Sequence, residues 1–97
     1  MKVRKVKDLI KVLKKKGFEL HPEKNDHNFY FLTINGKKTS INTFFSHGKS
    51  EYGDSLMLKI KTQLRFQNTK TAEDFFDCPL SKEKYIALLV DQGDIIL

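Results

Sequence analysis

The stretch that decides the fold is NDHNFYFLTINGKK, residues 25–38. It begins with a histidine before an aromatic run that is apolar on both faces, and it ends in Asn35-Gly36 followed by two lysines. Asn-Gly after an apolar run is the strongest short-range signal for a β-hairpin, because both residues tolerate positive φ. The sequence therefore predicts a strand over residues 29–34 and an antiparallel return over residues 37–45.

A two-residue turn also fixes the register of this hairpin. Counting outward from the turn predicts these facing pairs: Ile34 with Lys37, Leu32 with Thr39, Tyr30 with Ile41, and His27 with Phe44.

Segments on either side of the hairpin carry further patterns. Apolar residues at helical spacing predict a helix over residues 6–16 that ends at Gly17, and a second helix over residues 54–64. Residues 18–21 alternate apolar and polar, which predicts a first strand that Pro22 ends. The order helix, three antiparallel strands, helix predicts an α+β fold in which both helices cover one sheet face in two layers.

The charge divides the chain into two parts. Its 97 residues predict one domain. Residues 1–66, the predicted core, carry fifteen Lys and Arg against six Asp and Glu, whereas residues 67–97 carry three against six. The core is therefore +9 and the extension −3. A basic core attracts polyanions in a salt-dependent way, which indicates a nucleic acid or an acidic protein as partner; a lysine-rich surface that only confers solubility looks similar.

The extension, residues 67–97, is predicted to be helical and to pack on the same domain. Thr71 with Asp74, and Ser81 after Pro79, are typical of helix N-caps, and Gly93 is typical of a C-cap. One or two short acidic helices are therefore expected after the core.

Cysteine usage and hydropathy bear on the compartment. The lone Cys78 cannot form an internal disulfide, and it is expected to be a free, buried thiol. No apolar run is long enough to cross a bilayer, and the N-terminus alternates Lys with Val instead of forming a signal peptide. These patterns predict a soluble, cytoplasmic protein with no membrane partner.

Histidines are the first candidates for chemistry, because imidazole both gives and takes protons near neutral pH. His27 stands at the mouth of the hairpin, and His47 follows Phe44 by three residues, about 10 Å at the rise of a strand. The two could share one cleft, although isolated histidines more often serve packing or hydrogen bonding. His21 is expected to be structural or merely exposed. The sequence has no Cys pair and no His-x-x-x-His spacing, so no metal site is predicted. It also has no glycine-rich phosphate loop, so no cofactor is predicted.

Lysines near these histidines are candidates for binding an RNA backbone. Lys37 and Lys38 follow the turn, and Lys49 follows His47. Lys14 and Lys15 close the first predicted helix. For these helix lysines the alternative is a solvated face whose cations suit the negative end of the helix dipole.

The aromatic residues of the hairpin have two possible roles. Stacking of single-stranded bases is one, and a place in the hydrophobic core is the other. The set comprises Phe29, Tyr30, Phe31, Phe44 and Phe45.

Several short motifs, in their order and spacing, resemble the HicA-type toxins, small mRNA interferases of toxin-antitoxin pairs. The motifs are Lys16-Gly17-Phe18, Asp26-His27-Asn28-Phe29, Asn35-Gly36-Lys37-Lys38, Ser46-His47-Gly48-Lys49 and the apolar stripe from Leu56 to Leu64. The resemblance covers about residues 6–66. It implies a fold like the double-stranded-RNA-binding domain, α-β-β-β-α, and a HicB-type antitoxin as partner.

The resemblance also implies roles for single residues. The active-site histidine of the family falls on His27, and its second histidine falls on His47, with Gly48 and Lys49 following as expected. Asn25-Asp26 stands where Gly-Ser is usual in the family. The carboxylate beside His27 either raises the pKa of the imidazole and orients it, or repels a phosphate.

The sequence thus leads to three hypotheses. The first is a HicA-like, metal-independent endoribonuclease that cleaves mRNA with His27 as general acid or base, and binds RNA through Lys37, Lys38, His47, Lys49, Lys14 and Lys15. The second is a non-catalytic RNA-binding module of the same fold. The third is a protein-interaction domain whose acidic extension docks on its own or another basic face.

Overall fold

A computed structural model describes residues 1–22, 28–45 and 48–96 of the chain. The elements in order are β1 (Arg4–Lys5), α1 (Val6–Lys15), β2 (Phe18–Pro22), β3 (Asn28–Ile34), β4 (Lys37–Phe45), β5 (Glu51–Tyr52), α2 (Asp54–Gln63), α3 (Thr69–Asp77) and α4 (Lys82–Asp91). The predicted α+β order of helix, three strands and helix is confirmed, from α1 to α2. None of the described helices is long and apolar enough to span a membrane.

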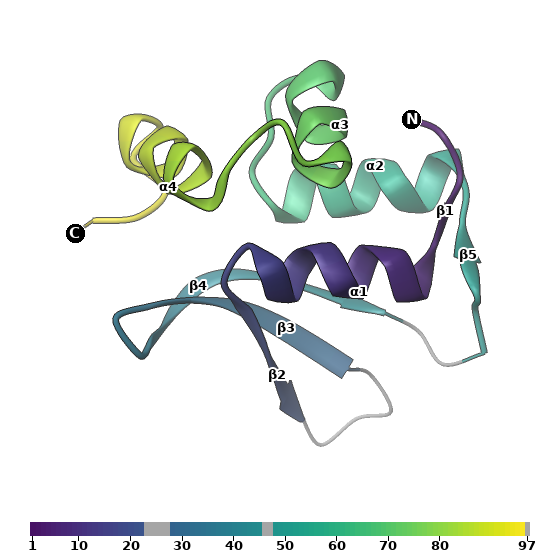
Figure 1. The fold of residues 1–97 in the computed structure, drawn as a ribbon, viewed down its shortest axis with the longest axis horizontal. Coiled ribbons are helices and arrows are strands. Elements are labelled where there is room, and N and C mark those ends of the chain that lie inside the picture. The colour runs from purple at the N-terminus through teal and green to yellow at the C-terminus, as the bar shows by residue number, and fades with distance from the viewer. Residues whose placement is uncertain (23–27, 46–47, 97) are drawn as a thin grey trace.

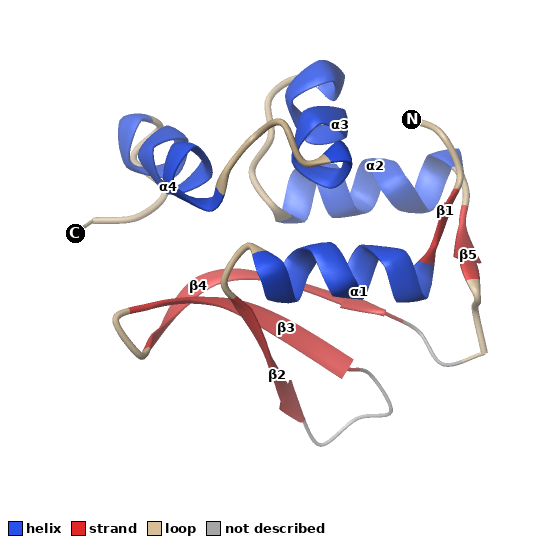
Figure 2. Ribbon diagram, in the orientation of Figure 1, coloured by secondary structure: helices blue, strands red, loops and turns tan. Residues whose placement is uncertain are grey.

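A three-stranded antiparallel sheet in the order β2-β3-β4 forms one layer. All four described helices lie on one side of this sheet (Figures 1 and 2). Strands β1 and β5 pair with each other in a separate two-stranded sheet at the far end from the β3–β4 hairpin (Figure 1). Neither strand was predicted, because a strand of two residues is too short to show a periodic pattern.

The register of the β3–β4 hairpin departs from simple counting. Ile34 does pair with Lys37, but an irregularity between Phe31 and Thr33 shifts every later pair by two residues, so that Tyr30 faces Thr43 and Phe29 faces Phe44. The predicted pair Tyr30–Ile41 is therefore wrong, and Phe44 faces Phe29 and not the predicted His27, which lies outside the described residues. Leu32 and Thr39 fall at the irregularity itself.

The side chain of Thr39 accounts for the irregularity. Its hydroxyl donates to the Leu32 carbonyl at 2.8 Å and accepts from the Ile41 amide at 3.2 Å, taking the place of direct backbone pairing. Since a two-residue shift preserves the alternation of faces, each β4 side chain stays on the side of the sheet that counting predicted.

One hydrophobic core lies between the sheet and the helices. Leu13 of α1, Met57 of α2 and Leu32 of β3 are fully buried in it. Helices α3 and α4 belong to the same core, because the ring centroid of Phe18 in β2 lies 6.4 Å from that of Phe75 and 6.2 Å from that of Tyr85. The acidic extension therefore completes the core that the first 66 residues begin.

Details at the helix ends correct two expectations. The N-cap of α3 is Asn68, whose side chain accepts from the Thr71 amide, so the prediction of Thr71 as cap is wrong. Ser81 does cap α4 and accepts from the Lys84 amide. Cys78 is a free thiol, but it is exposed and not buried, because it occupies the left-handed C-cap of α3 with a φ of 83°.

Candidate nucleic-acid interface

Two of the predicted site residues, His27 and His47, lie outside the described residues. The adjoining strand ends are Asn28, the first residue of β3 and next to His27 in sequence, and Phe45, the last residue of β4 and two residues before His47. These two residues face each other across the strands. The start of β3 and the end of β4 therefore lie together at the end of the hairpin that is farthest from the turn.

Four of the predicted RNA-binding lysines lie at the hairpin end of the molecule. Lys14 and Lys15 are exposed in the last turn of α1. The chain turns back after Gly17, whose carbonyl accepts from the Thr33 amide at 3.0 Å. Thr33 faces Lys38 across the hairpin. The structure thus brings Lys14 and Lys15 to the same end as Lys37 and Lys38.

Lys49 lies at the opposite end of α1. It lines a groove of about 540 Å³ with Lys5, Val6, Lys7, Ile10, Ser50 and Glu51. The Val6 amide donates to the Ser50 carbonyl at 2.8 Å and fixes this segment against the first turn of α1. Lys49 is therefore separated from the other four described lysines of the predicted site by the length of the helix, about 15 Å.

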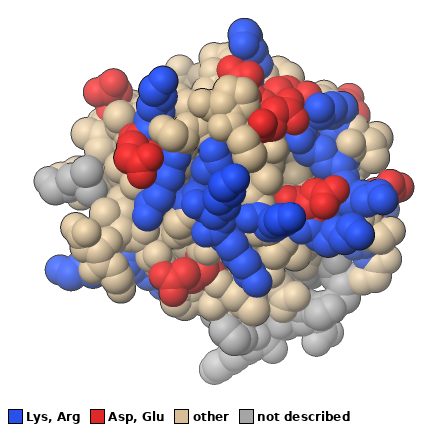
Figure 3. All heavy atoms as spheres, in the orientation of Figure 1, with Lys and Arg blue, Asp and Glu red and all other residues tan. Residues whose placement is uncertain are grey.

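A row of exposed lysines along α1 spans that distance. We call Lys7, Lys11, Lys14 and Lys15 the lysine stripe; all four are exposed. Lys7, Lys11 and Lys14 recur roughly once per turn, each turn advancing about 5.4 Å, and Lys15 lies next to Lys14. Leu9 and Leu13, on the other side of the same helix, are buried. Figure 3 shows Lys and Arg side chains gathered on this side of the molecule, over the middle of the view where α1 runs.

The acidic extension does not pair with the lysine stripe in any described ion pair. Its carboxylates on α3 bind the N-terminal segment: Arg4 pairs with Glu73 and Asp77, both at 3.0 Å, and Lys2 pairs with Asp77 at 3.2 Å. Hydrogen bonding by Arg4 lowers the pKa of Asp77. Although burial acts to lower the pKa of Arg4, the hydrogen bonds and charges of Asp77 and Glu73 outweigh it and raise that pKa.

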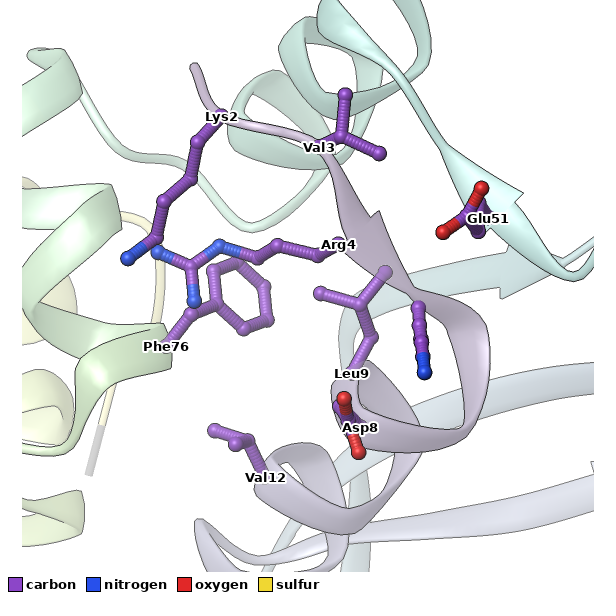
Figure 4. Close-up of a pocket in the computed structure, with 9 residues that line it drawn as sticks. Lys2, Val3, Arg4, Asp8, Leu9, Val12, Glu51 and Phe76 are labelled. Carbon is purple, nitrogen blue, oxygen red and sulfur yellow. The ribbon is translucent and has the colours of Figure 1, made fainter.

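The same arginine borders a cavity of about 350 Å³ between α1 and α3, shown in Figure 4. The guanidinium carbon of Arg4 lies 5.4 Å from the ring centroid of Phe76. Since Glu73 and Asp77 already neutralise the guanidinium, we assign this cavity to the contact between β1 and the extension and not to a second anion site.

The aromatic residues of the hairpin divide between the two faces of the sheet. Tyr30 and Phe45 are buried against the helices, as the core interpretation predicted. Phe29, Phe31 and Phe44 are only partly buried and alternate with the core residues along their strands, so they lie on the opposite face. Sequence reasoning did not separate the two sets, although period-two alternation was the signal that could have done so.

Metal binding has no support among the described residues, where no group of three or more His, Cys, Asp or Glu side chains could hold an ion.

The chain has no significant match to a protein-family model, a curated protein or a solved structure.

Proposed function

We propose that the protein is a HicA-like toxin with a double-stranded-RNA-binding-domain-like core, a metal-independent endoribonuclease that cleaves mRNA. The observation that carries the RNA-binding part is the lysine stripe. Lys7, Lys11 and Lys14 recur at about one helical turn, about 5.4 Å, and with Lys15 beside Lys14 they present a line of positive charge that suits successive phosphates. Lys37 and Lys38 extend this positive charge at the hairpin end.

The catalytic part of the proposal concerns His27. It precedes Asn28 by one residue and His47 follows Phe45 by two, and Asn28 and Phe45 face each other. In the proposed reaction, His27 takes the proton of a ribose 2′-hydroxyl or gives one to the leaving 5′-oxygen. The neighbouring cations offset charge at the phosphate. A HicB-type antitoxin neutralises the toxin by covering the lysine stripe.

A second candidate is a non-catalytic RNA-binding module of the same fold. The aromatic residues on the face of the sheet that no described helix covers favour it, because base stacking needs no reacting group. The third hypothesis, an acidic extension docked on the basic face, has less support, since the described α3 carboxylates pair with Lys2 and Arg4 and leave the lysine stripe without a described acidic partner.

Cleavage of a structured mRNA by the purified chain, with a chelator present, tests the proposal. We expect His27→Ala to lower the cleavage rate by about 10²–10⁴-fold, the usual contribution of general acid–base catalysis. Gln67→Ala, at an exposed position before α3, is the matched control and should cleave at the wild-type rate. Equal cleavage by His27→Ala and wild type would remove His27 from the mechanism. Salt-sensitive RNA binding without any products would establish the second candidate.

A further inference from the structure

The face of the sheet that no described helix covers carries a row of aromatic rings. Phe31 and Phe29 alternate with buried residues along β3, and Phe44 faces Phe29 from β4. His21 faces Phe29 from β2 and belongs to the same face. These four residues therefore cross all three strands. We call them the ring array.

The rings of this array lie within contact of one another. The centroids of Phe29 and Phe44 are 5.1 Å apart, and their planes meet at 34°. Phe29 and Phe31 are 6.4 Å apart at 29°, and the His21 ring stands edge-on to Phe31 at 5.4 Å. The Phe29 ring is thus inclined by 29° to 34° to its two phenylalanine neighbours, and the three rings form one cluster of aromatic surface for stacking flat groups.

A cation is held directly against the array. The Nζ atom of Lys38 lies 4.2 Å from the centroid of the Phe31 ring, within the range of a cation–π contact. Lys38 itself is exposed, so its ammonium can leave the ring for a phosphate while the ring accepts a flat partner. The Phe31 ring thus offers a face for a base, and the exposed Lys38 offers a cation for the phosphate of the same nucleotide.

Polar side chains flank the Phe31 ring on this face, one from each neighbouring strand. Glu19 faces Phe31 from β2, and its carboxylate accepts from the Thr33 hydroxyl at 2.6 Å. Asn42 faces Phe31 from β4 and donates to the Ser40 carbonyl at 3.0 Å. A cluster of rings bordered by hydrogen-bonded polar groups is unlike the continuous apolar patch of a stable protein–protein interface. It suits a nucleic acid strand, in which flat bases are joined by a polar backbone.

We infer that the ring array binds single-stranded RNA by stacking its unpaired bases. This inference rests on the RNA binding of the proposed function and names the substrate class as unpaired strands. Phenylalanine faces stack on any base, so recognition is tolerant of sequence. Bases inside a duplex cannot reach the rings, so the array selects single strands.

Fluorescence anisotropy with a labelled 2′-O-methyl oligouridine tests the inference. This probe forms no duplex, and its blocked 2′-oxygen prevents cleavage. Phe31→Leu keeps the apolar bulk and removes the ring, and we expect it to raise the Kd about 5- to 150-fold, the range for loss of one stacked base. The slope of log K against log salt should stay unchanged, since no cation is lost. Phe31→Tyr should bind like wild type. Leu58→Ala, which shortens an exposed side chain on α2, is the matched control.

Three results would overturn the inference. One is an unchanged Kd for folded Phe31→Leu. Another is an equal loss for the oligouridine and for an RNA duplex of the same length. A third is a dimer of the wild-type chain in sedimentation that becomes a monomer in Phe31→Leu. The ring array would then be an interface between two copies of the chain. If Phe31→Leu does not fold, ultraviolet crosslinking of the oligouridine to wild type decides: crosslinks should fall in the β3 and β4 peptides, and crosslinks confined to α1 would refute the ring array.

The same probe separates this inference from the proposed function. His27→Ala should lose cleavage and still bind the oligouridine as wild type does. Cleavage by wild type together with unchanged binding by Phe31→Leu would leave the nuclease standing without the ring array. Loss of binding by Phe31→Leu in a chain that never cleaves would leave the ring array standing without the nuclease.

Discussion

The ammonium of Lys16 donates a hydrogen bond to the backbone carbonyl of Leu80. Lys16 follows α1 and is only 4% exposed, and its Nζ also lies 5.6 Å from the ring centroid of Phe75. One buried lysine therefore ties the end of the first helix to the connection between α3 and α4. Its neighbours Lys14 and Lys15 are exposed, so three successive lysines divide between a structural and a surface role.

Replacing Lys16 by Met should destabilise the fold. Methionine keeps the apolar stem but leaves the Leu80 carbonyl without its donor, and a hydrogen bond to a charged group contributes about 1.5–3 kcal/mol. The free energy of unfolding from urea titration should fall by about that amount. Lys15→Met, at an exposed position, should change it by less than about 0.5 kcal/mol. Equal losses for the two variants would contradict the role assigned to Lys16.

Tyr85 should make the protein sensitive to alkaline pH. Its hydroxyl is buried and donates to the Leu64 carbonyl at 2.8 Å, and burial raises its pKa well above the ordinary range. The unfolded chain ionises at about pH 10 while the folded chain stays neutral, so stability is full below pH 10 and falls as the pH rises further.

Tyr85→Phe tests this dependence. The variant should lose about 1–2 kcal/mol at neutral pH, because the Leu64 carbonyl loses its donor. Its unfolding free energy should then decline less steeply than that of wild type above about pH 10. Urea titrations across this pH range provide the measurement. Parallel curves for the two proteins would show that Tyr85 is not the titrating group.

The ion pair between Arg4 and Asp77 should give a small, acid-sensitive contribution. Arg4 lowers the pKa of Asp77, so the stabilisation is present at neutral pH and disappears as the carboxylate is protonated below about pH 4. Since the Asp77 side chain is 43% exposed, we expect Asp77→Asn to cost at most about 1 kcal/mol. The difference from wild type should shrink as the pH falls below about 4, and a difference that stays constant through this range would exclude charge as its origin.

Cys78→Gly should stabilise the protein. Cys78 holds a φ of 83°, where glycine avoids a steric cost of about 1–2 kcal/mol that an L-residue bears. The thiol is exposed and no described contact depends on it. We expect the thermal midpoint to rise for Cys78→Gly and not for Cys78→Ala, which keeps the Cβ atom. A rise for both variants would point to the thiol itself as the unfavourable group.

The lysine stripe should set the salt dependence of RNA binding. Each phosphate contact to a single strand contributes about 0.7 to the slope of log K against log salt. Lys11→Gln combined with Lys14→Gln should therefore reduce the slope by about 1.4. Lys59→Gln combined with Lys84→Gln removes the same charge from exposed positions on α2 and α4. An equal reduction by both pairs would mean that only net charge matters.

Local patterns predicted most of the elements well. Strand β4 spans residues 37–45 as expected, and helices α1 and α2 begin at residues 6 and 54 as expected. These elements are encoded by apolar spacing, by Asn35-Gly36 and by Gly17, all of which act within a few residues. The candidate site was less accessible to prediction. The five lysines predicted to bind RNA are exposed, but four lie at one end of α1 and Lys49 lies at the other. The roles of His27 and His47 remain predictions.

The sequence by itself determined the hairpin, the two helices around the sheet and the excess of positive charge, because turn chemistry, periodicity and charge are local properties of the chain. Alternation along the strands divides the aromatic rings into two sets, but only the tertiary structure decided which set is core and which forms the ring array. It alone showed that Lys16 is buried and that Asn68, not Thr71, begins α3. The two-residue shift in the register of the β3–β4 hairpin at Thr39 was likewise visible only in the tertiary structure. Each of these depends on groups distant in sequence or on competition between side chain and backbone for hydrogen bonds, and neither leaves a periodic trace in the sequence.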